Sequence, residues 1–277
     1  MIRPLPDDLS RGDLFVRFRL RGKGDAGEKS GRLLPEGEIL SEDGSRHGVG
    51  EIFWLPPVRP GKIVAVGLND RGHALEMGKA LPAEPLLFLK APSSLGASGE
   101  SVIYPAVSSR VDFEGEIALV IGERADHVPP AEARRHLFGI CAANDITARD
   151  LQNRDVQYTR AKSFPGFCPI GPAILVGERP DGRSVRTWLN GVLKQDGCET
   201  DQIFRWESLI SYISHMMPLE TGDIVLTGTY RGIGPMSIGD TVTVSVEGCG
   251  PPLESRIVSD PHPALFTIWP GQTSQQS

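Results

Sequence analysis

The apolar runs of this chain are short, and turn-forming residues bound them. Ile63–Gly67 and Pro85–Leu89 are examples, each only long enough for one buried strand. Glycine (32 residues) and proline (23 residues) make up about a fifth of the 277 residues, against an average of about 12%. Because both residue types interrupt helices and form tight turns, this pattern predicts many short strands rather than a helical bundle.

The charge balance and the spacing of the cysteines limit the partners of the protein. The chain has 29 basic and 35 acidic residues and a net charge of −6, which disfavours a broad surface for nucleic acid or anionic membranes. No apolar run is long enough to span a bilayer, and the first residues lack the apolar segment of a signal peptide. The four cysteines have no disulfide or zinc-site spacing. We therefore expect a cytoplasmic protein with reduced thiols and no nucleic-acid or membrane partner.

Composition divides the chain into three parts. Residues 1–58 predict a small β-rich N-terminal unit, because apolar and polar residues alternate in its first strand-like segment and a proline cluster follows it. Residues 59–260 alternate strands with a few helices, predicted at 130–139 and 205–217, and form the expected catalytic domain. Residues 261–277 are a polar tail that we expect to be frayed.

Three carboxylates alternate along Val111–Gly122, which the pattern predicts to be one long strand. On a strand, residues two apart lie on the same face, so Asp112, Glu114 and Glu116 would share one face. Carboxylates crowded at the edge of a core repel one another unless a cation neutralises them, and Gly115 leaves space for a close backbone approach. The alternative is a solvated strand face, and this stretch alone does not decide between the two.

A further carboxylate, Asp145, follows a segment predicted to be buried and precedes a polar helix. Side chains at such a junction are often ligands. Together with Glu114 and Glu116 it would form an all-oxygen donor set, which suits Mg²⁺ or Mn²⁺ and suits zinc poorly. The alternative is that Asp145 is an ordinary helix N-cap.

Three other motifs could contribute to a site. His73 and Glu76 would be neighbours on a helix, and the carboxylate would make the imidazole a better general base for water. Lys162 precedes a rigid apolar loop and could bind a carboxylate or a developing enolate. The turn Thr227–Thr229 follows a strand and could bind a carboxylate through its hydroxyl and N–H groups. Each motif alone is also typical of an ordinary helix face, a surface lysine or a common turn.

Taken in order, these residues form a pattern that resembles the fumarylacetoacetate hydrolase family. The resembling motifs are Gly67–Asn69 with His73 and Glu76, Glu84–Lys90, Asp112–Glu116, Asn144–Gln152, Lys162–Pro172 and Thr227–Thr229. They cover about residues 60–258 and are similar both to fumarylpyruvate and acylpyruvate hydrolases and to 2-hydroxyhepta-2,4-diene-1,7-dioate isomerases and decarboxylases. The resemblance implies homodimers and a β-dominated α+β fold, a mixed β-sandwich roll with a few helices beside the small N-terminal unit.

The resemblance also implies a role for each motif. It implies one Mg²⁺ or Mn²⁺ ion per subunit, with Glu114, Glu116 and Asp145 as the metal ligands. It implies that His73 and Glu76 form a catalytic dyad on a segment that orders over the substrate, with Lys162 as a further catalytic residue. The substrate contacts that it implies are Lys90, Arg149, Gln152, Gly228 and Thr229.

Two positions depart from the family pattern. Asp70 stands where an aromatic residue is usual, and Tyr230 stands where a proline usually follows the Thr-Gly-Thr turn. We expect both positions near the substrate, so that the acyl side of the pocket would differ from that of better-known members.

These observations lead to three functional hypotheses. The first is metal-dependent hydrolysis of the C–C bond of a 2,4-diketo acid, an acylpyruvate such as fumarylpyruvate or maleylpyruvate, through an enolate. The second keeps the metal and the small 2-oxo acid substrate but isomerises, tautomerises or decarboxylates an unsaturated 2-oxo diacid from aromatic catabolism. The third is a metal-binding β protein without catalysis, in which His73, Glu76 and Lys162 would have no catalytic role.

Overall fold

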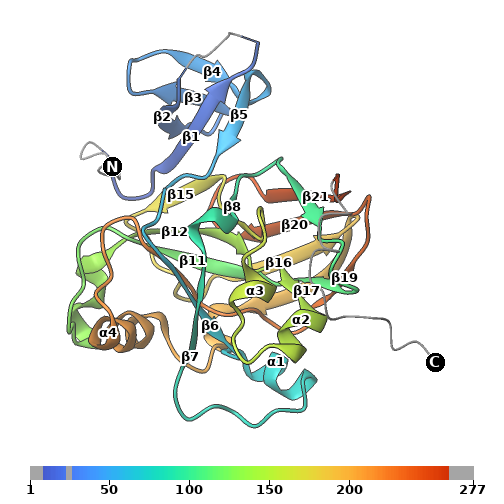
Figure 1. Ribbon diagram of the computed structural model, residues 1–277. Coiled ribbons are helices and arrows are strands. Elements are labelled where there is room, and N and C mark those ends of the chain that lie inside the picture. The colour runs from blue at the N-terminus through green and yellow to red at the C-terminus, as the bar shows by residue number, and fades with distance from the viewer. Residues whose placement is uncertain (1–8, 23–26, 262–277) are drawn as a thin grey trace.

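Strands dominate the computed structural model, which describes residues 9–22 and 27–261 (Figure 1). The main sheet has eleven strands in the order β4-β3-β2-β1-β15-β12-β11-β18-β6-β7, with β5 also paired to β1. Its strands are β1 (Leu14–Leu20), β2 (Lys29–Leu33), β3 (Glu38–Ser41), β4 (Arg46–Gly48), β5 (Ile52–Leu55), β6 (Ile63–Gly67), β7 (Leu86–Lys90), β11 (Gly115–Ile121), β12 (Leu137–Asn144), β15 (Ala173–Val176) and β18 (Ile224–Leu226).

Three smaller sheets complete the strand content. A five-stranded sheet has the order β17 (Val192–Cys198), β16 (Ser184–Leu189), β20 (Thr241–Val246), β21 (Leu253–Ser259) and β9 (Ser101–Tyr104). A three-stranded sheet contains β13 (Thr147–Ala148), β10 (Val111–Phe113) and β19 (Gly234–Met236), and β14 (Cys168–Pro169) pairs with β8 (Leu95–Gly96). Most neighbours are antiparallel, but β18 and β6 are parallel, so the sheets are mixed and the predicted fold class is confirmed.

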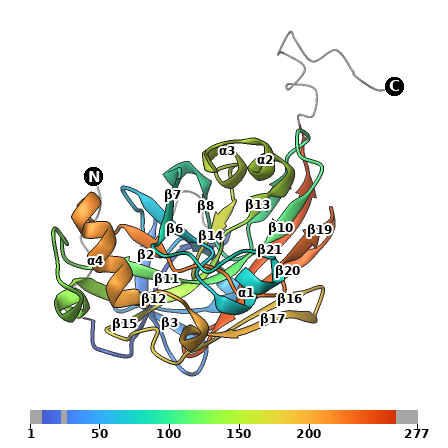
Figure 2. The ribbon, with the colours of Figure 1, turned by 90° about the horizontal axis from the view of Figure 1, so that it is seen from below.

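Helices are few and short. They are α1 (Arg71–Glu76), α2 (Arg149–Arg154), α3 (Thr159–Lys162) and α4 (Trp206–Met216), with 3₁₀ turns η1 (Val49–Glu51), η2 (Pro92–Ser94), η3 (Pro130–His136) and η4 (Glu199–Asp201). In both ribbon views α4 lies at the left of the molecule, apart from α2 and α3, which lie next to each other (Figure 1 and Figure 2). Within the described residues, no helix combines the length and the apolar character needed to cross a membrane.

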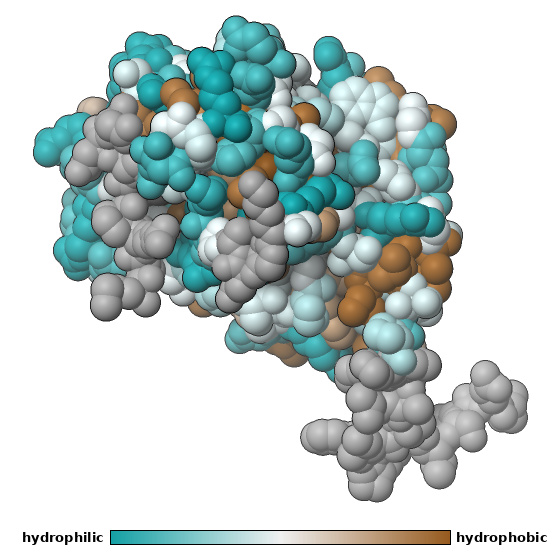
Figure 3. Space-filling model, turned by 90° about the horizontal axis from the view of Figure 1, so that it is seen from above, coloured by the Kyte–Doolittle hydropathy of each residue, from teal (hydrophilic) through white to brown (hydrophobic). Residues whose placement is uncertain are grey.

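β11 lies at the centre of the core, and both of its faces are buried. Ile117 and Leu119 belong to an apolar cluster that also contains residues of α4 and of the five-stranded sheet. Ala118 and Val120 belong to a second cluster on the opposite face. Outside this core, the face seen from above is mostly polar, with apolar residues in separate patches (Figure 3). The rigid position of β11 matters because the candidate site begins at its first residues.

Residues 14–55 contain five short strands, β1 to β5, and the predicted division of the chain into separate parts stays a prediction. Strands β1 to β5 form a group at the top of Figure 1. Its β1 pairs with β15, so the unit is continuous with the main sheet through backbone hydrogen bonds. The predicted boundaries near residues 58 and 260 stay predictions, and the tail that we expect to be frayed lies outside the described residues from position 262 onward.

The single strand predicted for Val111–Gly122 is wrong, because two strands occupy this stretch. β10 and β11 are separated at Glu114 and belong to different sheets. β10 pairs with β13 and β19, whereas β11 pairs with β12 and β18. The change of pairing partners redirects the chain at Glu114, so the simple alternation of side chains does not continue through this residue.

The two predicted helices have different outcomes. The amphipathic helix predicted at 205–217 is confirmed as α4. The helix predicted at 130–139 is wrong, since a 3₁₀ turn ends at His136 and residues from Leu137 onward form β12. Gly139 lies against β15, where a side-chain Cβ would come within 2.4 Å of the Leu175 carbonyl oxygen, so sheet pairing replaces the helix there. The four cysteines are free, and three of them are buried.

Candidate active site

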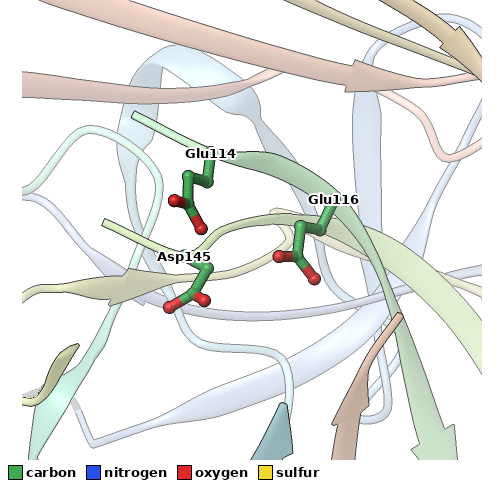
Figure 4. Close-up of side chains that lie close together, drawn as sticks. All are labelled: Glu114, Glu116 and Asp145. Atoms are coloured by element: carbon green, nitrogen blue, oxygen red, sulfur yellow. The ribbon is translucent and has the colours of Figure 1, made fainter. Parts of the chain in front are cut away.

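Three carboxylates from two separate segments meet at one point (Figure 4). Glu114 lies in the link between β10 and β11, Glu116 is in β11, and Asp145 directly follows β12. Each residue offers a carboxylate oxygen, these oxygens lie within 4.8 Å of one another, and no residue of the three is more than 4% exposed. The Asp145 N–H donates to the Glu114 carbonyl over 2.8 Å and joins the segments. We call these three residues the carboxylate triad.

Gly115 allows this arrangement because the five-stranded sheet lies directly against it. A Cβ at this position would be 2.1 Å from the Thr187 hydroxyl oxygen of β16 and 3.1 Å from the Gln195 amide oxygen of β17. No side chain fits at such distances, so glycine permits the close approach expected from the sequence. The absence of a side chain at Gly115 therefore determines where the backbone of the neighbouring residues Glu114 and Glu116 lies.

Three buried cations contact the triad. The Lys162 ammonium group donates to Glu114 Oε2 over 2.8 Å and to Asp145 Oδ2 over 2.5 Å. Arg149 donates to the other oxygen of Glu114, and Lys90 donates to the other oxygen of Asp145. Although burial raises the pKa of the Glu114 carboxyl, the charges and hydrogen bonds of Lys162 and Arg149 outweigh it and leave this pKa below its ordinary value.

Glu116 differs from the other two members of the triad. Its carboxylate accepts the Gly228 N–H over 2.7 Å, and no ion pair to it occurs in the part of the chain that the structure describes. Burial, followed by the charges of Asp145 and Glu114, raises the pKa of Glu116 well above its ordinary value. Of the three carboxylates in the triad, Glu116 is therefore the one whose ionised form an added cation would stabilise most.

The donor chemistry of the triad fits a hard divalent cation. All three donors are carboxylates, and they are buried close enough together to hold one ion. Such a set matches the oxygen ligands that Mg²⁺ and Mn²⁺ prefer. The helix N-cap interpretation of Asp145 does not apply, because Ala148 is the N-cap of α2.

Asp112 does not join the triad, contrary to the shared face expected from the sequence. Its carboxylate accepts from Arg110 Nε over 2.9 Å and from Arg149 Nε over 3.0 Å. The cause is the change of direction at Glu114. Arg149 therefore contacts both Asp112 and Glu114, and this pair of ion contacts fixes the orientation of its guanidinium group.

His73 and Glu76 lie one turn apart on α1. His73 Nδ1 and Glu76 Oε2 are 3.3 Å apart, and His73 is 6% exposed. The Asp70 carboxylate caps the helix by accepting the His73 N–H over 2.6 Å. Glu76 also accepts the Gly232 N–H at 3.1 Å. These contacts hold the imidazole in place and give it a carboxylate partner.

A cavity of about 90 Å³ lies between α1 and the triad, enough for several water molecules at about 10–15 Å³ each. Of the residues proposed from the sequence, its lining includes His73, Lys162, Arg149, Gln152, Thr229 and the triad. Its other lining residues are Val66, Gly67, Leu68, Met77, Lys79, Leu86, Phe88, Asn153 and Tyr158. The structure thus brings most of the proposed metal, catalytic and substrate residues to one cavity.

Two proposed substrate contacts lie behind this lining. The Lys90 side chain is fully buried, and its ammonium group contacts Asp145 and the Phe167 carbonyl, the latter over 2.9 Å. The Gly228 N–H is bound to Glu116. In this structure both residues hold triad members in place.

The two departures from the family pattern are also buried behind the cavity. Asp70 is 2% exposed and caps α1, while Tyr230 is 1% exposed, with its hydroxyl 3.3 Å from the Gln202 amide nitrogen. Burial, followed by the charge of Glu116, raises the pKa of Tyr230 well above its ordinary value. Neither residue is among those that line the cavity.

Sequence reasoning missed Gln195, a buried residue of β17. Its amide oxygen accepts the Gly115 N–H over 2.9 Å, and its amide nitrogen donates to Thr229 Oγ1 over 2.9 Å. Its neighbours Lys194 and Asp196 are exposed. This alternation is the only signal of an inward-facing glutamine, and it is useful only once the segment is known to be a strand.

The fold and the cavity define a class: β-dominated proteins with a buried carboxylate triad, suited to one divalent ion, beside a histidine–glutamate pair. A family model described as fumarylacetoacetate (FAA) hydrolase C-terminal matches residues 62–258. The chain belongs to this family. Members of the family are enzymes, among them hydrolases, isomerases and tautomerases.

Individual relatives agree with this assignment. An uncharacterised protein of Archaeoglobus fulgidus is 41% identical over 215 residues, covering 78% of this chain and 86% of that protein. The oxaloacetate tautomerase YisK of Bacillus subtilis is 37% identical over 219 residues, covering 74% of this chain and 73% of YisK. The crystal structure of 2-hydroxyhepta-2,4-diene-1,7-dioate isomerase from Mycobacterium marinum has a TM-score of 0.81 and 31% identity, covering 90% of this chain and 99% of that one.

Proposed function

We propose that the protein is a divalent-metal-dependent enzyme that acts on a small 2-oxo acid through its enolate. The observation that carries this proposal is the cavity that the triad, Arg149, Lys162 and His73 line together. Glu76 lies 3.3 Å from the His73 ring. Glu114, Glu116 and Asp145 would hold one Mg²⁺ or Mn²⁺ ion. Such an ion acts as a Lewis acid on an oxygen that gains charge during the reaction.

The side chains of the cavity supply the remaining functions. Arg149 and Lys162 are positive and line the cavity, so they attract the carboxylate of the substrate and stabilise the charge of its enolate. His73 acts as the general base, and Glu76 orients its ring and stabilises the protonated form. Val66, Leu86 and Phe88 form an apolar part of the cavity lining.

In the first version of this function, the substrate is an acylpyruvate and the reaction is hydrolysis. His73 takes a proton from water while the water oxygen attacks the C4 carbonyl. The C3–C4 bond then breaks, and its electron pair stays with the pyruvate part as an enolate. A proton returned to C3 gives pyruvate, and the acyl part leaves as a carboxylic acid.

The names of the relatives favour a second version, in which no water enters the products. The curated relative YisK is named an oxaloacetate tautomerase, and the similar solved structure is named an isomerase. For a 2-oxo diacid such as oxaloacetate, His73 would move a proton between C3 and the enol oxygen. Decarboxylation of the same class of substrate also proceeds through an enolate, so the same groups would serve it.

A substrate panel separates these versions. The purified protein is incubated with acylpyruvates, fumarylpyruvate, maleylpyruvate, oxaloacetate and unsaturated 2-oxo diacids, with Mn²⁺ or with EDTA. Cleavage yields pyruvate plus an acid, decarboxylation releases CO₂, and isomerisation leaves the mass unchanged. His73→Ala should remove turnover. His215→Ala, at an exposed histidine on α4, serves as the matched control and should keep it. Metal binding without turnover of any compound would favour a non-catalytic protein.

We also propose a homodimer, as the family resemblance implies, and a cytoplasmic location, which the spacing of the cysteines supports. One chain has a mass of 30.0 kDa, so a dimer would scatter light as a particle of twice that mass. A particle with the mass of one chain would contradict the proposal.

A further inference from the structure

The groups behind Thr229 allow only one orientation of the Gln195 amide. Gln195 is 1% exposed. Its Oε1 accepts the Gly115 N–H over 2.9 Å, and its Nε2 donates to the Tyr230 carbonyl over 2.7 Å. A backbone N–H can only donate and a carbonyl can only accept. Exchanging the amide oxygen and nitrogen would therefore break both contacts, so the assignment is unambiguous.

This orientation determines the hydrogen bonds of the Thr229 hydroxyl. The second hydrogen of Gln195 Nε2 points to Thr229 Oγ1, 2.9 Å away, so the hydroxyl oxygen accepts there. Its own hydrogen then goes to the Gly115 carbonyl, 3.0 Å away. One lone pair of the hydroxyl oxygen is left. Thr229 lines the cavity, whereas Gln195 and Gly115 do not. A ligand that reaches this hydroxyl therefore meets an acceptor that has no hydrogen to donate.

We infer that Gln195 is a positioning residue that makes the Thr229 hydroxyl a hydrogen-bond acceptor towards the cavity. The ligand group that faces Thr229 is then a donor, such as the hydroxyl of an enol, rather than a carboxylate or keto oxygen. This inference rests on the proposed function and deepens it, because it specifies that the site favours the enol form of a 2-oxo acid. It also differs from the interpretation of this turn as a carboxylate-binding element.

Gln195 has a second contact that a test must separate from the first. Through Gly115 it touches the strand that carries Glu114 and Glu116, so its loss could act on the triad instead of on Thr229. Thr187 offers a matched control, because it is paired with Gln195 across β16 and β17 and its buried hydroxyl has no hydrogen-bond partner among the residues that the structure describes. Thr187→Val changes the same packing layer without changing the contacts of Thr229.

A double-mutant cycle with a turned-over 2-oxo acid and Mn²⁺ tests the route through Thr229. Thr229→Val and Gln195→Met should each lower kcat/KM about tenfold, the effect of one hydrogen bond. The double variant should be no worse than Thr229→Val alone, and Thr187→Val should match the unsubstituted protein. Full additivity of the two losses would mean that Gln195 acts elsewhere and would overturn the inference.

A binding experiment needs no turnover. Lactate and pyruvate share a carboxylate and a methyl group, but lactate has a hydroxyl donor on C2 where pyruvate has a keto oxygen. Calorimetry with Mg²⁺ present should show tighter binding of lactate, by about tenfold, and this preference should vanish in Gln195→Met and Thr229→Val but not in Thr187→Val. A preference that survives both variants, or no binding of either compound, overturns the inference. Lack of turnover by the unsubstituted protein counts only against the proposed function.

Discussion

Replacing Gly115 by alanine should damage the metal site through packing alone. The added Cβ would lie 2.1 Å from the Thr187 hydroxyl oxygen, whereas ordinary contact begins at 3.4 Å, so the Thr187 side chain or the two strands must shift by more than 1 Å. Overpacking of a core typically costs about 1–3 kcal/mol, which corresponds to a melting temperature lower by about 2–6 °C for a chain of this size. A displacement of this size at Glu114 and Glu116 should weaken Mn²⁺ binding by on the order of 10- to 100-fold.

A second substitution should restore much of the loss. Thr187→Ala removes the clashing oxygen, and the next contacts of the new Cβ are then Gln195 Oε1 at 3.1 Å and Val244 Cγ1 at 3.3 Å. Because the Thr187 hydroxyl has no hydrogen-bond partner within the described part of the chain, its removal alone should cost only about 1 kcal/mol. Thermal unfolding and calorimetric Mn²⁺ titration of both single variants and the double variant measure the coupling. Losses that simply add, or a neutral Gly115→Ala, would refute the reasoning.

Three further predictions concern the charges of the site. Glu116→Gln should raise the free energy of unfolding of the metal-free protein by about 0.5–2 kcal/mol, because burial and the neighbouring carboxylates disfavour the ionised form of Glu116. The same substitution should abolish tight Mn²⁺ binding. A lower melting temperature of the metal-free variant would contradict the prediction. Since the folded-state pKa of Glu116 is raised, its stabilising contribution is present below the ordinary pKa of glutamate and is lost as the pH rises through the raised value. Mn²⁺ binding needs the ionised form of Glu116, so below that raised pKa the Mn²⁺ affinity should rise by up to about tenfold for each unit of increasing pH. A Mn²⁺ affinity that calorimetry finds constant between about pH 5 and 8 would argue against this prediction. His73→Ala should lower kcat by about 10²- to 10⁴-fold with unchanged Mn²⁺ affinity, and turnover equal to that of a His215→Ala control would disprove its role as base.

Local sequence patterns predicted elements well where one periodicity continues through a whole element. The helix predicted at 205–217 is α4 almost residue for residue, because its apolar side chains recur at helical spacing on one buried face. The alternation in Val111–Gly122 is also regular, but the chain changes sheets at Glu114. Which strands lie next to β10 and β11 depends on residues far along the chain. No local pattern could therefore reveal the break or the separation of Asp112 from the triad.

In the candidate site, too, local patterns predicted some residues, and contacts between distant segments were not predicted. Residue type and spacing were enough to select the three carboxylates and the His73–Glu76 pair. They could not reveal that Lys90 contacts Asp145, since the two are 55 positions apart and lie at the ends of strands that are not neighbours in the sheet. Gln195 is a stronger case, because its partners Gly115 and Thr229 come from two other segments. Such supporting contacts depend on tertiary structure and have no sequence signature of their own.

The pairing of β1 with β15 has a practical consequence for work with shortened forms of the protein. A fragment limited to the family-matched residues 62–258 would lack β1. All four residues of β15 are buried. In the fragment, one edge of β15 would lose its pairing with Leu14, Phe15 and Val16 of β1. An uncovered apolar strand edge is a template to which strands of other chains can pair. Such a fragment should precipitate or form edge-to-edge aggregates during expression, even though it would retain every residue of the carboxylate triad.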